Sequence, residues 1–166
     1  MKKIVMYAFV LCLLATSAFA MPQMKNSPDG FRGLKWGDPA TKIQGRKIVE
    51  DSGYLKIFVD PKAKLSLGNV PLESINYVFC KNRLMGVDLR FSNSHFQDMK
   101  QILYTQYGQP ISEKPHIDRF GWLDDNAMVN LEKYLDGSSV KISSIYEINL
   151  MDKVQKENAQ SAGNDF

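Results

Sequence analysis

The sequence predicts an α+β domain: a mostly antiparallel, meander-like sheet with one main helix packed on it. Apolar side chains alternate with polar ones over residues 75–79 and again over residues 85–91, which is typical of two adjacent strands. Residues 96–107 carry apolar side chains at helical spacing instead. Further strand-like segments follow this helix, and strands gathered around a single helix favour an antiparallel sheet over βαβ units.

The N-terminus has the pattern of a cleavable secretory signal over residues 1–20. Lys2 and Lys3 precede an apolar run, which ends in the small-residue box Ala18-Phe19-Ala20. That run is shorter than the roughly 20 residues that a membrane-spanning helix needs. The residues directly after Ala20 are Met21 and Pro22, so no cysteine stands at the cleavage point to accept a lipid. We therefore expect export without a stable membrane anchor, to a bacterial periplasm rather than to the medium.

Removal of this signal changes what the composition implies. The formal net charge of +3 falls to +1, because Lys2 and Lys3 leave with the signal. No basic stripe remains to indicate a nucleic-acid or anionic-membrane partner. Cys80 becomes the single cysteine, since Cys12 lies in the signal, so a hydrophobic core and not a disulfide must hold the fold.

The mature chain divides into three parts by composition. Residues 21–29 form a polar leader with two prolines, which predicts flexibility. Residues 30–150 form a single domain, large enough to bury about two thirds of its unfolded surface. Residues 151–166 are rich in Asn, Gln, Lys and Ser, which predicts a disordered tail.

The segment FRGLKWGDP, residues 31–39, predicts a short strand or hook followed by a turn. Its Phe31, Leu34 and Trp36 would be buried, and a brief N-terminal helix would run through Ile43. A phosphate-binding loop is not favoured, because the glycines lack the spacing of such loops.

The next strands are predicted over residues 54–59 and 65–67. The clearest pair, residues 75–79 and 85–91, should form a hairpin. A three-residue loop, Cys80-Lys81-Asn82 with Asn82 left-handed, would place both apolar sets on one face.

The main helix should be capped by Ser94 and end at Gly108-Gln109-Pro110. Strands are expected over residues 120–123, 127–131 and 140–146, with turns at 124–126 and 136–138. The Gly-x-Pro turn at 108–110 echoes that at 37–39, which leaves open whether the chain contains a duplicated unit.

These motifs support a resemblance. The FRGxxWG opening, the strand pattern IxYxF and the helix ending in YGxP resemble small secreted bacterial proteins of uncharacterised function, over roughly residues 31–146. More loosely, a helix ending in Gly-x-Pro before antiparallel strands is similar to the helix-plus-sheet modules of outer-membrane assembly lipoproteins and of β-lactamase inhibitor proteins. That likeness implies a protein-binding role at the level of fold alone.

Few residues could carry chemistry. His95, His116 and Cys80 share no metal-ligand spacing and are fewer than the four ligands of a structural zinc site. Asp124-Asp125-Asn126 lacks the order of a calcium loop, so a turn explains it. No cofactor or metal is predicted.

Two functions remain open. The first is a non-enzymatic binding module that docks an envelope protein or a cell-surface ligand through a sheet face or edge, with anchors among the aromatic residues Tyr54, Phe58, Trp122 and Tyr134. The alternative is a small envelope hydrolase or transferase that uses Cys80, His116 and Asp118. The sequence indicates no oligomeric state.

Overall fold

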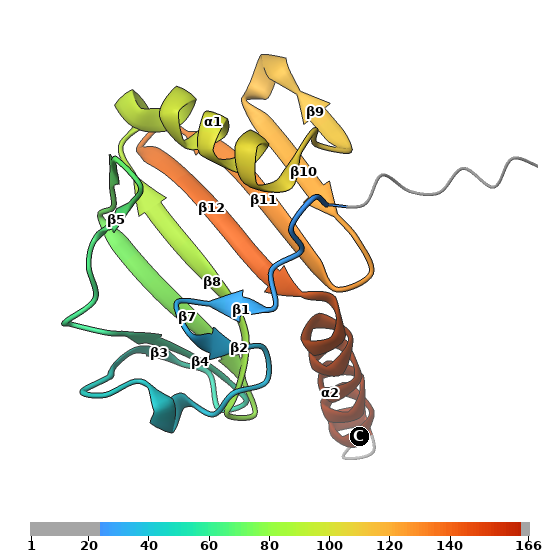
Figure 1. Cartoon of the computed structure of the whole chain (residues 1–166). Helices are drawn as coiled ribbons and strands as arrows, with labels where there is room; N and C mark the ends of the chain where they lie inside the picture. Colours follow the sequence, from blue (N-terminus) through green and yellow to red (C-terminus); the bar gives the residue numbers. More distant parts are fainter. Residues whose placement is uncertain (1–23, 164–166) are drawn as a thin grey trace, which may run out of the picture.

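A computed structural model describes residues 24–163 and contains one large, fully antiparallel sheet (Figure 1). The predicted α+β class is confirmed. The eight strands of the sheet, in spatial order, are β3 (Lys47–Asp51), β4 (Leu55–Val59), β7 (Ser74–Cys80), β8 (Arg83–Phe91), β12 (Gly137–Ser144), β11 (Ala127–Tyr134), β10 (Arg119–Leu123) and β9 (Ser112–Lys114).

The sheet consists of two four-stranded meanders that meet where β8 pairs with β12. The first meander is β3-β4-β7-β8 and the second is β9-β10-β11-β12, so both run from an outer edge to the centre. Each follows a Gly-x-Pro turn whose glycine is left-handed: φ is 81° at Gly37 and 85° at Gly108. The two halves share strand order but differ in what precedes them, a strand pair in one and a helix in the other.

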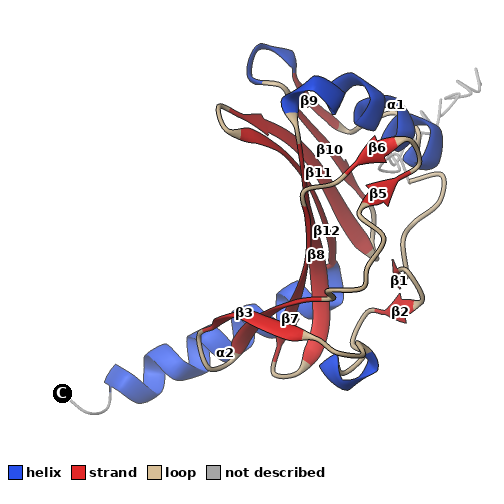
Figure 2. Cartoon of the chain, turned by 90° about the vertical axis from the view of Figure 1, so that its left-hand side faces the viewer, coloured by secondary structure: helices blue, strands red, loops and turns tan. Residues whose placement is uncertain are grey.

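The remaining elements lie mostly on one side of this sheet (Figure 2). The main helix, α1, and two small strand pairs cover that side, whereas the C-terminal helix, α2, projects from the lower end on the other side. These elements are β1 (Gly30–Phe31), β2 (Leu34–Lys35), η1 (Ala40–Lys42), β5 (Ser66–Leu67), β6 (Val70–Pro71), η2 (Asn93–His95), α1 (Phe96–Tyr107), η3 (Pro115–Ile117) and α2 (Ile145–Gly163).

Helix α1 is the predicted main helix, and its apolar stripe packs on the sheet. Phe96, Met99, Leu103 and Tyr107 are buried, and burial of each such side chain contributes about 2 kcal/mol. The cap differs from the prediction, because a 3-10 turn precedes the helix. Ser92, rather than Ser94, accepts a backbone hydrogen bond there, from Ser94 N–H.

The β7–β8 hairpin corrects the predicted three-residue loop. Cys80 pairs with Arg83, so the turn is the two-residue Lys81-Asn82. Both turn residues are left-handed, with φ of 46° and 63°. This turn matches the right-handed twist of the strands. The predicted left-handed Asn82 is confirmed.

A β-bulge restores the predicted apolar face. The register shifts after Val78, so that Phe79 pairs with Leu84 while Tyr77 pairs with Val87. Met85 is the extra residue, and Leu84 takes its place in the core. The bulge therefore places the apolar side chains of both strands on one face, which the three-residue loop was expected to do.

The FRGLKWGDP segment forms the predicted hook, although its Phe31, Leu34 and Trp36 are half-buried against the core rather than buried as expected. Strands β1 and β2 pair through a tight turn, and Trp36 donates its indole N–H to Pro28 O at 2.7 Å. The 3-10 helix η1 follows, as expected, and Ile43 is buried beyond it.

The two ends of the domain are more ordered than their composition predicts. In the leader, Met24 is buried and Lys25 N–H donates to Tyr107 O at 3.1 Å, so residues 24–29 lie against the domain. In the tail, α2 begins at Ile145, where a strand through 146 was expected, and continues to Gly163. Among the side chains of α2 that the structure describes, Glu147 and Val154 are buried. A helix with so little apolar surface gives no clear periodic signal.

The predicted signal at residues 1–20 lies outside the described residues. No helix in the described part of the chain is long and apolar enough to cross a membrane. Cys80 is a free, buried cysteine.

Candidate binding face

The side of the sheet opposite α1 is its concave side and forms the candidate site, which we call the open face (Figure 2). Strand alternation decides which side chains reach it. The register aligns the core residues Leu89, Val140 and Leu131 across β8, β12 and β11, so their sequence neighbours point to the open face. The polar members of the open face are Asn76, Asp88, Arg90, Arg119, Asn130, Glu132, Tyr134, Ser139 and Lys141.

Four of these residues make up the centre, where the two meanders meet. Asp88 lies opposite Lys141, and Arg90 lies opposite Ser139. Asp88 Oδ1 is buried here without a hydrogen-bond partner among the described residues, whereas Ser139 Oγ, which is also buried, lies beside the Tyr134 hydroxyl. Burial raises the pKa of Asp88, and the charges of Lys141 and Arg90 only partly oppose that shift.

Beside this centre lies a cluster around Tyr134. The Tyr134 hydroxyl donates to Glu132, which also binds Arg119 Nε at 2.6 Å. The guanidinium of Arg90 sits 5.8 Å from the centre of the Tyr134 ring. The hydrogen bond to Glu132 and then burial raise the pKa of Tyr134, so the phenol is protonated at neutral pH. An aromatic ring with flanking guanidinium groups is typical of binding hot spots.

Exposed apolar side chains lie at the end of the open face, next to the Tyr134 cluster. The turn after β11 exposes the whole side chain of Leu135, and η3 exposes Ile117. Together with Tyr134 and their polar neighbours, they line a hollow of about 720 Å³. Exposed apolar side chains beside a polar surface favour contact with a partner.

The four aromatic residues selected from the sequence separate in the structure. Tyr134 belongs to the open face and is 36 % exposed. Tyr54 lies just before β4, where its hydroxyl accepts from Gln155 of α2. Phe58 and Trp122 are in the core on the α1 side, and Trp122 is only 1 % exposed, with its indole N–H bound to Gly108 O at 2.8 Å. Neither buried residue can anchor a partner, because strand alternation turns both of them inward.

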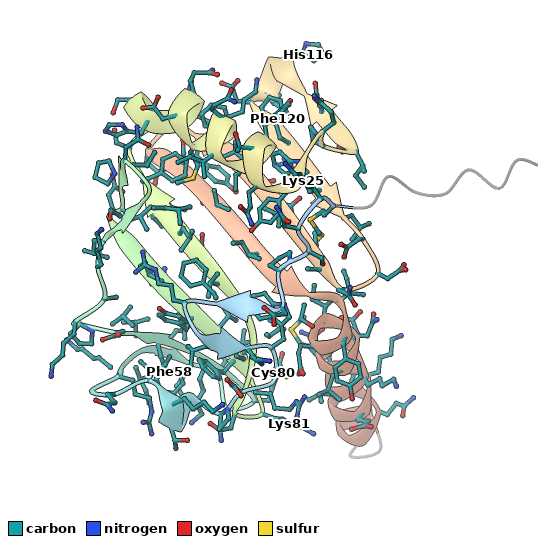
Figure 3. All side chains as sticks on the ribbon, in the orientation of Figure 1. Lys25, Phe58, Cys80, Lys81, His116 and Phe120 are labelled. Carbon is teal, nitrogen blue, oxygen red and sulfur yellow. The ribbon has the colours of Figure 1, made fainter. Side chains whose placement is uncertain are left out.

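The structure does not assemble the alternative set of Cys80, His116 and Asp118. Cys80 and His116 lie at opposite ends of the molecule (Figure 3). Burial raises the pKa of the Cys80 thiol, which Lys81 partly opposes and Glu147 reinforces. Asp118 is bound to Lys133 Nζ at 3.2 Å. A nucleophile must lie within hydrogen-bond reach of its base, and this one does not.

The other polar candidates have local roles. Asp124 Oδ1 accepts hydrogen bonds from Asn126 N–H and Ala127 N–H, which form the predicted turn. It also accepts a hydrogen bond from the Ser27 hydroxyl, which joins the turn to the leader. His95 lies 3.5 Å from Asp98 in the next turn. Within residues 24–163, no group of His, Cys, Asp and Glu side chains could hold a metal ion.

The centre of the open face was missed from the sequence. Asp88 and Arg90 occupy the polar positions of an alternating strand, which ordinarily point to solvent. Their burial depends on Lys141 and Ser139, about fifty residues away, through the β8–β12 pairing. The detectable signal was that both residues are charged and flanked by strongly apolar positions.

Comparisons of this chain with protein families, with curated proteins and with solved structures found no match.

Proposed function

We propose that this chain is a non-enzymatic binding module, exported to a bacterial periplasm, that holds a partner protein of the envelope against its open face. One observation carries this proposal. Beyond α2 at its lower end, no described element covers the concave side of the sheet, and Asp88 Oδ1, a buried acceptor without a partner within the described chain, lies at its centre. A buried acceptor without a donor costs about 1–3 kcal/mol, which a bound partner could recover.

The chemistry of the face defines the partner. Asp88 requires a hydrogen-bond donor, such as an amide, a hydroxyl or a lysine side chain. Tyr134 and Arg90 offer an aromatic and a guanidinium anchor. The face spans five neighbouring strands, β7, β8, β12, β11 and β10, and is therefore about 19 Å across. That breadth suits the surface of a protein better than a small molecule.

The resemblance to helix-plus-sheet modules that bind other proteins supports the same class of function by analogy of fold. The balanced charge of residues 21–166 and the mixed charges of the open face likewise support a protein partner over nucleic acid.

The test is a quantitative capture experiment on the full chain in envelope extracts that have been cross-linked. One variant carries Arg90→Glu and Lys141→Glu on the open face. Its matched control carries Lys25→Glu and Lys62→Glu, the same change of charge at two exposed lysines away from that face. A variant with Trp122→Ala is unsuitable, since Trp122 is in the core.

We expect one specific protein to be captured by the wild-type chain and by the control, and its yield to fall at least about tenfold with the open-face variant. Equal loss with both variants, or no loss with either, would contradict binding through the open face. Unfolding curves of both variants establish that each is folded.

A further inference from the structure

We infer that the pocket between the β1–β2 hook and β7 binds a small organic anion, a monocarboxylate with a short apolar body. The pocket lies on the opposite side of the sheet from the open face, so this inference is independent of the proposed function. Its volume is about 520 Å³, within the range of small-molecule sites. Its lining combines an apolar floor of Leu34, Ile43 and Ala63 with the polar residues Arg32, Lys42, Gln44, Asp60, Lys64 and Tyr77.

Tyr77 is the first observation that indicates a ligand. It is only 4 % exposed, and no hydrogen bond joins its hydroxyl to another described residue. Burial raises the pKa of this phenol, the charge of Arg32 lowers it and that of Asp60 raises it. The hydroxyl therefore remains protonated at neutral pH and presents an unused donor to the pocket.

Arg32 is the second observation that indicates a ligand, because the β1–β2 hook holds its side chain at the pocket. Its backbone is left-handed, with φ of 50°, next to Gly33 at 82°. The guanidinium donates to Lys64 O and to Ser66 O, each at 2.6 Å, and lies 5.3 Å from the centre of the Phe31 ring. These contacts hold the cation in place and leave further N–H groups for a ligand, so little ordering is required on binding.

The charges around the pocket select the class of ligand. Lys42 is paired with Asp38 at 2.7 Å, whereas the ammonium of Lys64 has no carboxylate within ion-pair distance in residues 24–163. Arg32 and Lys64 thus favour an anion, which Tyr77 can hold with a hydrogen bond. Asp60 opposes a second negative charge. The apolar floor favours a ligand with a few carbon atoms over an inorganic ion.

The test is titration calorimetry of the full chain with hexanoate, hexyl phosphate, inorganic phosphate and hexanol. Two variants probe the site. Tyr77→Phe removes only a hydroxyl without a partner, and Arg32→Asn keeps a residue that tolerates the left-handed conformation. Arg46→Gln, outside the pocket lining, is the matched loss of charge. Denaturation curves verify that all variants fold.

We expect hexanoate to bind the wild-type chain and Arg46→Gln equally, and to bind Arg32→Asn and Tyr77→Phe about tenfold more weakly. Hexanol and inorganic phosphate should bind at least about tenfold more weakly than hexanoate, and hexyl phosphate should also bind more weakly. Failure of hexanoate to bind, binding that neither variant weakens, or binding of hexanol as tight as that of hexanoate would overturn the inference. Tighter binding of hexyl phosphate would overturn the assignment to a monocarboxylate.

Discussion

Arg83 donates two hydrogen bonds to Glu147, from Nε to Oε2 at 3.0 Å and from Nη2 to Oε1 at 2.5 Å. Glu147 is 1 % exposed, whereas the side chain of Arg83 is partly open to solvent. The pair joins the first turn of α2 to the start of β8. Gly37 of the hook completes this junction, because a Cβ there would lie 2.5 Å from Arg83 Nη2 and 2.9 Å from Glu147 Oε1.

Replacing Glu147 with alanine should lower the free energy of unfolding by about 2 kcal/mol. The change leaves Arg83 without its acceptor and opens a cavity under α2, although the solvent exposure of Arg83 limits the loss. Urea denaturation followed by circular dichroism measures the effect. Asp152→Ala, at an exposed position of the same helix, is the control and should change stability by less than about 0.5 kcal/mol. Equal effects of the two substitutions would contradict the described junction.

Gly37→Ala should destabilise the chain more than Gly33→Ala. Both glycines are left-handed, with φ of 81° and 82°, so alanine costs about 1 kcal/mol of backbone strain at either position. Only at Gly37 does the new methyl group meet the Arg83–Glu147 pair, while nothing lies within 4 Å at Gly33. We expect an additional loss of about 2 kcal/mol at Gly37 in thermal or urea unfolding. Similar losses at both glycines would show that the contact is unimportant.

Cys80 should be unreactive in the native chain. It is completely buried, and burial raises its pKa, so little thiolate is available. Labelling of residues 21–166, where Cys80 is the single cysteine, with a chromogenic disulfide reagent at pH 8 should be at least about a hundredfold slower in buffer than in urea. Glu147→Ala should accelerate the native reaction, because it loosens the helix near Cys80. Rapid labelling of the native wild-type chain would instead revive the thiol-enzyme hypothesis.

Asp88→Asn should raise the free energy of unfolding of the free chain at neutral pH, as measured by urea denaturation over a range of pH. The folded-state pKa of Asp88 is raised above 3.8, so its ionised form is disfavoured by folding. This cost is absent well below pH 3.8, grows as the pH rises through the interval up to the folded pKa, and is constant above it. The stability gain of the variant should follow the same course. Asp136→Asn, at an exposed position, serves as control. A gain that does not change with pH would contradict this assignment.

Periodicity made much of the fold predictable, because the buried stripes of α1, β7 and β8 are long and strongly apolar. Strand β3 was missed since all five of its residues are exposed and lack alternation. Helix α2 was missed because Glu147, which is buried in its first turn, is charged and is bound by an arginine distant in sequence.

The candidate site was less predictable for a related reason. The sequence shows which residues alternate but not which face of the sheet a helix covers, so Trp122 and Phe58 were selected together with Tyr134. Asp88 and Lys141 become neighbours only through the pairing of β8 with β12. That pairing joins the two meanders across the intervening helix and strands, and no local pattern specifies it.

The most direct test of the central claim is site-specific photo-cross-linking of the full chain in living cells. A photoreactive phenylalanine analogue replaces Asn76, Met128 or Tyr134 on the open face, or Gln97 or Gln101 on the exposed surface of α1. The account predicts that the open-face positions yield the same cross-linked protein and that the α1 positions do not. Cross-links from α1 alone, or none from the open face, would contradict a binding module that works through its concave sheet.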